Sequence, residues 1–239
     1  MFKFVKAFFK GLYKILLSYP KIRKYQKHKD KYSREERYSF LRKLVNILFK
    51  SFNVKVNVKG LEKLDPNETY FIVSNHQSMA DALTLIHLFE KPMSAVCKIE
   101  ALKYPIIGRA CDMVDIIFID RDNIRDAVKM LKASKEFLNN SVSVAIFPEG
   151  TRAKDENYTP AEYKSGALKP AFETKSKIAA LAIDGSYKVF SKKHKKDITI
   201  NVEVVDVYDF DSYGVKNTNE LAHEIYTKTV EKINEFRQQ

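Results

Sequence analysis

The sequence has few of the residues that define several structural classes. It contains two cysteines, Cys97 and Cys111, so there is no disulfide framework and no CxxC pair for zinc or redox chemistry. Seven glycines and seven prolines in 239 residues argue against a collagen-like or linker-rich chain. No stretch free of Asp, Glu, Lys and Arg exceeds twelve residues, which is too short for a bilayer-spanning helix. We therefore expect a globular chain whose thiols suit a reducing compartment.

Common catalytic signatures are missing as well. The sequence has no GxSxG serine elbow and no GxGxxG or GxxxxGK[ST] loop for nucleotide phosphates. Its five histidines, at positions 28, 76, 87, 194 and 223, form neither an HExxH motif nor a Cys/His ligand cluster. These absences argue against a serine hydrolase, a nucleotide-binding loop and a zinc enzyme.

Charge is distributed unevenly along the chain. Residues 1–60 contain 17 Lys and Arg against 3 Asp and Glu, a net charge of +14. Residues 61–239 contain 25 against 27, a net charge of −2. A basic segment joined to a nearly neutral domain indicates contact with an anionic surface, either a lipid headgroup layer or nucleic acid.

The first twenty residues favour the lipid surface. On a helix, the lysines of this segment lie within an arc of roughly 80°, and Phe, Leu, Ile, Val and Tyr fill most of the rest; the lysines are Lys3, Lys6, Lys10 and Lys14. This pattern predicts a helix lying in the headgroup plane, which we expect to end at Pro20. The interspersed lysines make a bilayer-spanning helix or a signal peptide a poor fit.

A second helix is predicted over residues 34–52, where apolar residues recur at helical spacing. Residues 21–31 are expected to form a basic connector that anionic headgroups attract. Two alternatives stay open: both helices could cover the core of the domain, or the basic arm could bind nucleic acid. Nucleic-acid binding is the weaker alternative, because its usual motifs are absent and a Phe-rich face has no duplex partner.

The rest of the chain alternates between short β-branched runs and helical patterns. Seven runs predict strands, the last with one solvated face: residues 54–58, 70–74, 94–97, 116–119, 142–147, 178–183 and 198–207. Helices are predicted over 123–139 and 217–237, the second with a capping box of Asn217 and Glu220. Strand 116–119, helix 123–139 and strand 142–147 predict a βαβ unit with parallel strands. The expected fold is therefore α/β, with a mixed, largely parallel sheet flanked by helices.

Three polar motifs lie where predicted strands end: Ser74–Asp81, Phe118–Arg121 and Phe147–Arg152. If these strands run parallel, the three motifs share one edge of the sheet. In open α/β sheets, ligands bind outside the carboxyl ends of the strands. This edge is therefore the predicted site.

The first motif suggests acid–base chemistry. His76 is followed five residues later by Asp81, and a carboxylate on one ring nitrogen fixes the tautomer that leaves the other as a base. The pair alone is a weak signal. Ser78 and Asp81 also fit a helix capping box, and the two roles are compatible.

The other motifs carry candidate phosphate-binding residues. The guanidinium groups of Arg121 and Arg152 match phosphate through paired hydrogen bonds, although a lone arginine is more often solvated or in a salt bridge. Gly150 permits a turn with close backbone approach. Glu149 could bind a substrate hydroxyl or pair with an arginine.

The three motifs, in this order and spacing, resemble the glycerophospholipid acyltransferase family, particularly its bacterial 1-acyl-sn-glycerol-3-phosphate acyltransferases. The resemblance covers about residues 54–210 and extends to Lys164–Ala167 and Ala182–Ser186. Two positions depart from the family pattern: Asp115 stands where a glycine is usual, and Ala180 where a proline is usual.

The resemblance implies a glycerolphosphate acyltransferase-like fold, with basic amphipathic membrane-docking helices in residues 1–53 and an acyltransferase domain in residues 54–239. It implies that His76, oriented by Asp81, deprotonates the sn-2 hydroxyl of 1-acyl-sn-glycerol 3-phosphate. That oxygen attacks an acyl-CoA or acyl carrier protein thioester directly and gives phosphatidate. No acyl-enzyme, cofactor or metal is implied. The substrate-binding residues carried over from the motifs are Asn75, Arg121, Glu149, Gly150, Thr151 and Arg152.

The expected partners are lysophosphatidate, the acyl thioester and an anionic membrane surface, without nucleic acid. The expected location is peripheral, or monotopic, on the cytoplasmic face of the cell membrane. One alternative is a sibling acyltransferase that acts on another lysolipid or an aminoacyl lipid. Another is a membrane-surface binding protein with a relic site.

Overall fold

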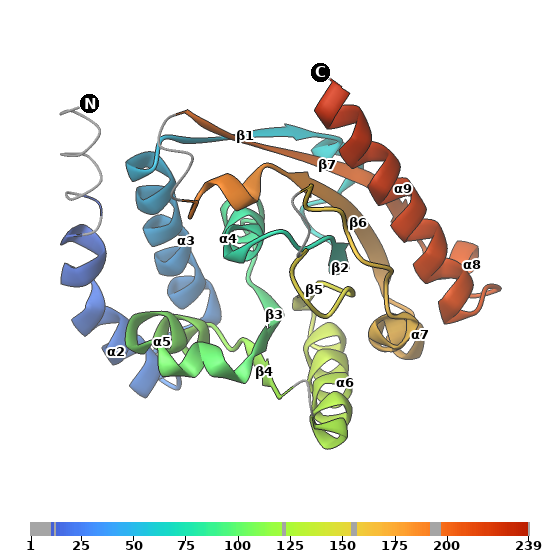
Figure 1. Ribbon diagram of the computed structural model, residues 1–239. Coiled ribbons are helices and arrows are strands. Elements are labelled where there is room, and N and C mark those ends of the chain that lie inside the picture. Colours follow the sequence, from blue (N-terminus) through green and yellow to red (C-terminus); the bar gives the residue numbers. More distant parts are fainter. Residues whose placement is uncertain (1–10, 12, 121–122, 154–156, 192–196, 239) are drawn as a thin grey trace.

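The computed structural model describes residues 11, 13–120, 123–153, 157–191 and 197–238. Within these residues, seven strands form one sheet in the order β1-β7-β6-β2-β5-β3-β4 (Figure 1). Their bounds are β1 Val54–Lys59, β2 Tyr70–Ser74, β3 Met93–Lys98, β4 Ile117–Ile119, β5 Ser143–Ile146, β6 Lys177–Asp184 and β7 Ile198–Tyr208. Every predicted strand is present, and no predicted end differs by more than one residue.

Strand direction brings the three motifs to one edge of the sheet. Strands β6, β2, β5, β3 and β4 run parallel, so their carboxyl ends lie together. Strands β1 and β7 are parallel to each other, and β7 is antiparallel to β6. Helix α6 (Ile124–Asn139) connects β4 to the parallel strand β5, with β3 between them. The mixed, largely parallel sheet and the parallel βαβ strands are confirmed.

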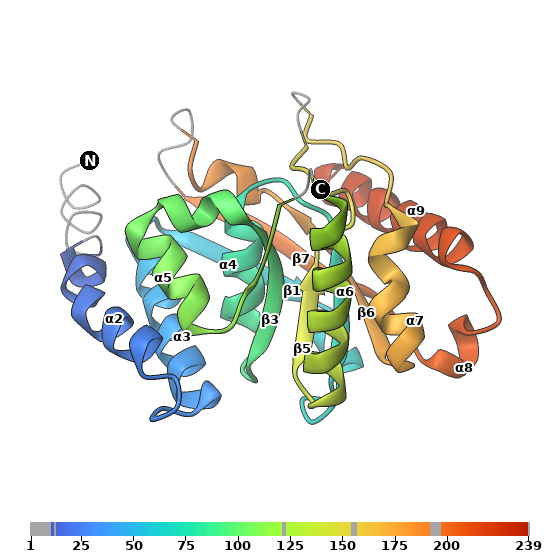
Figure 2. The same ribbon diagram turned by 90° about the horizontal axis from the view of Figure 1, so that it is seen from below.

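Helices cover both faces of the sheet (Figures 1 and 2). Along β2, Ile72 packs into one hydrophobic cluster, whereas Phe71 and Val73 pack into the other. The Ile72 cluster includes residues of α2 (Tyr19–Lys27), α3 (Arg34–Ser51), α4 (Met79–Leu88) and α5 (Pro105–Met113). The other cluster includes residues of α6, α7 (Lys169–Thr174) and α9 (Thr218–Gln238). Short helical turns complete the fold: η1 Leu61–Lys63, η2 Ile99–Lys103, η3 Ser165–Leu168, η4 Ser186–Lys188 and α8 Phe210–Tyr213.

The N-terminal region differs from the prediction. Residues 13–17 are helical, Ser18 forms a turn, and α2 begins at Tyr19. The expected end at Pro20 and the connector over 21–31 were therefore wrong, because Pro20 lies in the first turn of α2. A first-turn N–H has no intrahelical acceptor, so proline costs nothing there. The predictions for residues 1–10 and 12 lie outside the described residues.

Helices α2 and α3 pack on the domain core; for the predicted helix over 34–52 this agrees with one of the open alternatives, whereas most of the predicted helix over 1–20 lies outside the described residues. Their buried residues include Ile22, Tyr25, Tyr38, Leu41, Leu44, Val45 and Phe49. Just before α2, by contrast, Tyr13 is 61% exposed, Leu16 51% and Leu17 61%. No helix in the described part of the chain is both long and apolar enough to cross a membrane.

The structure shows the surroundings of Asp115 and Ala180, the two positions that depart from the family pattern. Asp115 has a positive φ of 60°, a conformation that glycine adopts easily. Its carboxylate lies 3.0 Å from Lys29 Nζ, 3.3 Å from Arg34 Nε and 3.0 Å from Arg37 Nη1. Asp115 therefore links the region of α2 and α3 to the sheet. Ala180 lies at a register shift between β6 and β7, an irregularity that also accommodates proline.

Candidate active site

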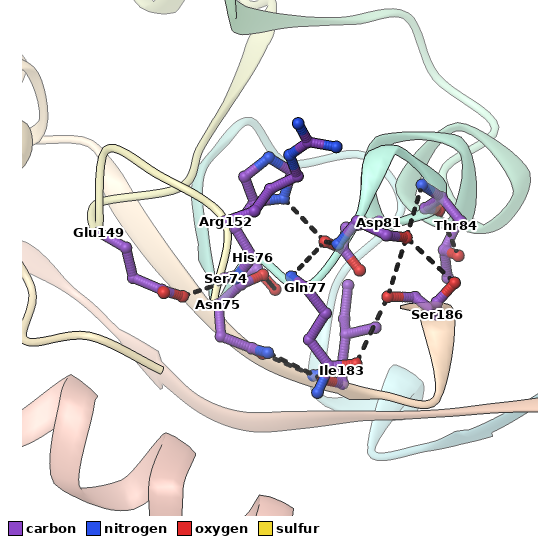
Figure 3. Close-up of polar contacts among 12 residues, drawn as sticks. Ser74, Asn75, His76, Gln77, Asp81, Thr84, Glu149, Arg152, Ile183 and Ser186 are labelled. Atoms are coloured by element: carbon purple, nitrogen blue, oxygen red, sulfur yellow. Dashed lines mark hydrogen bonds and ion pairs between the residues drawn. The ribbon is translucent and has the colours of Figure 1, made fainter. Parts of the chain in front are cut away.

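The loop after β2 holds an imidazole against a buried carboxylate. His76 Nδ1 lies 2.7 Å from Asp81 Oδ2, and the Asp81 side chain is fully buried (Figure 3). A carboxylate offers only acceptors, so Nδ1 carries the hydrogen and donates it. The other ring nitrogen, Nε2, then has the lone pair that a general base needs. The predicted pairing of His76 with Asp81 is confirmed as a contact.

Asp81 also caps helix α4. Ser78 is the N-cap, and its hydroxyl accepts the N–H of Ala80 at 3.0 Å. Asp81 Oδ2 accepts the backbone N–H groups of Gln77 at 2.7 Å and Ser78 at 2.8 Å. One carboxylate oxygen therefore contacts the imidazole and caps the start of the helix, so both predicted contacts are present.

The third motif holds His76 from the neighbouring strand β5. The imidazole stacks on the Phe147 ring, with 4.2 Å between centroids and 14° between planes. The His76 N–H donates to Glu149 Oε1 at 2.6 Å, and its carbonyl oxygen accepts the N–H of Ala153 at 2.8 Å. Ring and backbone of His76 are therefore both fixed by residues 147–153.

The buried Glu149 side chain supports the loop that contains His76. Oε2 accepts the N–H of Ala161 at 3.0 Å, so both carboxylate oxygens are engaged by backbone donors, and the residue is 2% exposed. Burial raises the pKa of Glu149 to about 7, although the two N–H donors oppose that shift. The structure thus places Glu149 behind His76, where it positions the loop, and not at an open surface facing a substrate.

Asn75 has a similar supporting position. Its side chain is fully buried, Nδ2 donates to the Ile183 carbonyl at 2.8 Å, and Oδ1 accepts the Ile183 N–H at 2.8 Å (Figure 3). Because both polar groups of the amide are bonded to β6, Asn75 fixes the loop to the sheet. Direct contact with a substrate, as predicted for this residue, would require breaking these bonds.

Gln77 connects the same loop to the C-terminal helix. Its Nε2 donates to Asp184 Oδ1 at 2.8 Å, and its Oε1 accepts the N–H of Gly185 at 3.1 Å. Arg237, on α9, donates to the same Asp184 oxygen through Nη2 at 2.8 Å and Nε at 3.1 Å. Asp184 therefore joins α9 to the residue that follows His76.

Cationic residues border this edge of the sheet. Arg152 is exposed and precedes Ala153, the residue bonded to the His76 carbonyl. Gly150 has φ 70°, and a Cβ built there would lie 3.0 Å from Lys164 Nζ, so the turn brings this ammonium group close to the backbone. Thr151 Oγ1 donates to the Arg152 carbonyl at 3.4 Å. Arg121 lies outside the described residues, and its predicted role stays a prediction.

Sequence comparison defines the family. Residues 55–184 match the sequence profile of a family described as Acyltransferase. The chain belongs to the acyltransferase family. A Mycoplasma pneumoniae protein named probable 1-acyl-sn-glycerol-3-phosphate acyltransferase is 32% identical over 167 residues, or 68% of this chain and 61% of the relative. The 1-acyl-sn-glycerol-3-phosphate acyltransferase alpha of Mus musculus is 31% identical over 146 residues, or 61% and 50%.

The chain therefore spans about three fifths or less of the length of these curated relatives. The crystal structure of the 1-acyl-sn-glycerophosphate (LPA) acyltransferase PlsC from Thermotoga maritima has a similar fold. The TM-score is 0.76, and the match covers 100% of this chain and 98% of that one at 19% identity. The fold class predicted from the sequence is confirmed by this likeness.

The sequence did not point to several residues at this edge of the sheet. Lys98 ends β3, and the strand-end argument that selected Arg121 could have found it. No local signal pointed to Asp184 with Arg237, because their contact spans 53 positions. In the described ranges, no group of three or more His, Cys, Asp or Glu side chains could hold a metal ion. That the reaction needs no metal stays a prediction.

Proposed function

We propose that this acyltransferase moves a fatty acyl group from an acyl thioester to the sn-2 hydroxyl of 1-acyl-sn-glycerol 3-phosphate, giving phosphatidate. The observation that carries the proposal is the contact of His76 Nδ1 with Asp81 Oδ2 at 2.7 Å. This contact leaves Nε2 free to act as a base, at an edge of the sheet that is bordered by cationic residues. The names of the relatives supply the substrate class.

His76 would act as general base. Nε2 takes the proton of the acceptor hydroxyl while that oxygen bonds to the thioester carbonyl carbon. The resulting oxyanion collapses, the carbon–sulfur bond breaks, and the proton passes from Nε2 to the leaving thiolate. Asp81 stabilises the imidazolium that forms between these steps. No covalent bond to the protein forms, because the hydroxyl attacks the thioester itself.

Cations beside the base support an acceptor with a phosphate. A dianionic headgroup forms strong, charge-assisted hydrogen bonds with guanidinium groups. Arg152 is exposed and directly precedes Ala153, whose backbone N–H donates to the His76 carbonyl. We assign the phosphate of the acceptor to Arg152 and Arg121, at the turn formed by Gly150 and Thr151.

We further propose a peripheral location on the cytoplasmic face of the membrane, with residues 1–53 as the docking segment. Its support is the +14 charge of residues 1–60 and the exposure of Tyr13, Leu16 and Leu17. Anionic headgroups attract each basic residue near the surface by about 1 kcal/mol. Because α2 and α3 bury their apolar faces, the apolar contact made by residues 1–53 would come from those before Ser18.

The test is thiol release by the full chain with an acyl-CoA or an acyl carrier protein thioester, with and without 1-acyl-sn-glycerol 3-phosphate. The expected result is release that depends on this acceptor, with phosphatidate detected by mass and its new acyl group removed by phospholipase A2. Release without acceptor would instead identify a thioesterase. If only another lysolipid or an aminoacyl lipid supports release, that lipid is the acceptor and lysophosphatidate is not. If no pair of donor and acceptor gives release, the protein is a membrane-surface binding protein and not an enzyme of this reaction.

A further inference from the structure

Large apolar side chains are exposed together in one short segment. Between β3 and the middle of α5, Ile99 is 41% exposed, Leu102 48%, Tyr104 61% and Ile107 39%. Single exposed apolar residues are normal on a protein surface, but a group of them marks an interaction site. We call these four residues the η2–α5 patch.

The η2–α5 patch lies beside the active-site edge. It begins directly after Lys98, the last residue of β3, and β3 runs parallel to β5, whose end carries Phe147. Met79, the first residue of α4 and three positions after His76, is also 47% exposed. Figure 2 shows η2 and the start of α5 on the same side of the molecule as the loops that follow β5 and β6. The segment that carries the patch and the catalytic loop therefore lie at the same edge of the sheet.

The backbone under the patch is tightly packed. The Gly108 N–H donates to the Tyr104 carbonyl at 2.7 Å. A Cβ built at Gly108 would lie 2.8 Å from Leu102 Cα and 3.0 Å from the Ala101 oxygen. The 3₁₀ turn η2 therefore sits directly on α5, and the apolar side chains are presented by a preformed surface.

The neighbouring helix extends this surface toward the basic N-terminal region. Gln26 Nε2 donates to Asp112 Oδ2 at 2.7 Å, Arg109 Nη1 donates to Gln26 Oε1 at 2.9 Å, and Lys29 pairs with Asp112 at 2.8 Å. Helix α2 is thereby fixed along α5 (Figures 1 and 2). Residues 13–17, which carry their own exposed apolar side chains, lead directly into α2.

The chemistry of this surface matches an anionic bilayer. Leu and Ile favour the acyl region, and Tyr favours the boundary with water. Lys103 ends η2 and is exposed; Lys98, directly before η2, is also exposed and pairs with Glu100 at 2.6 Å. Most of the positive charge comes from residues 1–60, which have a net charge of +14. Apolar side chains beside a strong positive charge are complementary to anionic headgroups over acyl chains.

We propose that the η2–α5 patch enters the headgroup layer of an anionic phospholipid bilayer and directs the His76 edge toward it. This inference rests on the proposed function, because an acceptor held in the bilayer by its acyl chain must meet Nε2 at the surface. The patch is a second contact, separate from residues 1–18. It sets the orientation of the active site, whereas the basic segment supplies long-range attraction.

The absence of tryptophan from the chain allows a direct test. Tyr104→Trp introduces a single fluorophore in the patch, and Val215→Trp introduces one at an 87% exposed position before α9. With phosphatidylglycerol–phosphatidylcholine vesicles, the indole emission of the Tyr104→Trp variant should shift to the blue and be quenched by brominated acyl chains. The Val215→Trp variant should show neither change. Equal, water-like emission from both variants on bound protein would overturn the proposal.

A second test links the patch to turnover. Leu102→Asp combined with Tyr104→Asp should lower turnover of vesicle-embedded lysophosphatidate at least about tenfold. It should leave turnover of a short-chain, water-soluble lysophosphatidate unchanged. Val128→Asp, at a 64% exposed position on α6, is the control and should change neither. Unchanged turnover in vesicles would contradict the proposal. So would a change in oligomeric state alone, because it would mean that the patch contacts a second copy of the chain. If the wild type acylates no acceptor, the proposed function fails, while the fluorescence test still decides the docking surface.

Discussion

Asp81 Oδ2 accepts the Nδ1–H of His76 at 2.7 Å and, with the same oxygen, the backbone N–H of Gln77 at 2.7 Å. The orientation of the base is therefore tied to the first turn of α4. A mobile loop around His76 would have to be reordered in every catalytic cycle. Here the loop is fixed by the helix cap, by Glu149 and by Ala153, so the imidazole is preorganised.

Replacing Asp81 with Asn tests the charge of this pair. The amide keeps the size of the side chain but cannot stabilise an imidazolium, so kcat should fall roughly 10²- to 10⁴-fold. Ser78→Ala is the matched control, because it removes the capping hydroxyl and leaves the carboxylate. It should cost about 1 kcal/mol of stability and change kcat little. Equal kcat losses in the two variants would mean that Asp81 acts only as a helix cap.

Arg152→Ala tests the phosphate assignment. Loss of a charge-assisted hydrogen bond of about 1.5–3 kcal/mol should raise the KM for lysophosphatidate roughly 10- to 100-fold. The KM for the thioester should stay unchanged, since the acyl group carries no phosphate next to the reacting carbon. Arg152→Lys should recover part of the loss by retaining the charge. An unchanged acceptor KM in Arg152→Ala would remove this residue from the phosphate site.

Arg237→Ala tests whether the C-terminal helix positions the base. Without the guanidinium, Asp184 loses both hydrogen bonds from Arg237 and keeps the one from Gln77, so the loop around His76 loosens. We expect kcat to fall roughly tenfold or more, with both KM values and the pH dependence unchanged. Arg237→Lys should restore much of the rate. A lower melting temperature with unchanged kcat would show that the contact is only structural.

The ion pairs of Asp115 with Lys29, Arg34 and Arg37 predict a pH-dependent contribution to stability. Arg37 is 5% exposed, and Asp115→Asn would remove the carboxylate with which it forms a salt bridge, at a cost of about 3 kcal/mol. Asp115→Gly suits the positive φ better but should also be less stable than the wild type, because it removes the same ion pairs. Urea unfolding of the three proteins at pH 7 measures these differences. Greater stability of the glycine variant would show that backbone strain outweighs the ion pairs.

The sign of the pH effect follows from the pKa of Asp115. Burial alone raises this pKa, but the hydrogen bonds and charges of Lys29 and Arg37 hold it below its ordinary value. A lowered carboxyl pKa stabilises the folded state above the ordinary pKa, and the stabilisation is lost as the pH falls through the folded value. The difference between wild type and Asp115→Asn should therefore be constant above about pH 5 and shrink below about pH 4.

The parts of the fold that could be predicted were those fixed by local patterns. Short β-branched runs located each strand, and Asn217 with Glu220 forms the predicted capping box, at 3.1 and 3.0 Å. His76 and Asp81 are likewise only five positions apart, so their contact depends on local structure. Pro20 was misjudged, because a proline ends one helix and begins the next with equal ease.

The contacts that could not be predicted join distant parts of the chain. Asn75 and Glu149 are polar residues at strand ends, and their spacing does not reveal whether they face a ligand or a buried backbone group. Only the pairing of β2 with β6 and β5 brings Ile183 and Ala161 within reach of them. The link from Gln77 through Asp184 to Arg237 likewise exists only once the sheet has formed.

The most direct test compares the wild type with His76→Ala in acceptor-dependent thiol release. We expect lysophosphatidate to stimulate release by the wild type, and we expect the variant to lose at least about 10²-fold in kcat. Binding of the variant to anionic vesicles should be unchanged, since His76 is not part of the docking surface. Near-normal turnover by a folded His76→Ala protein would contradict the general-base role and the mechanism built on it.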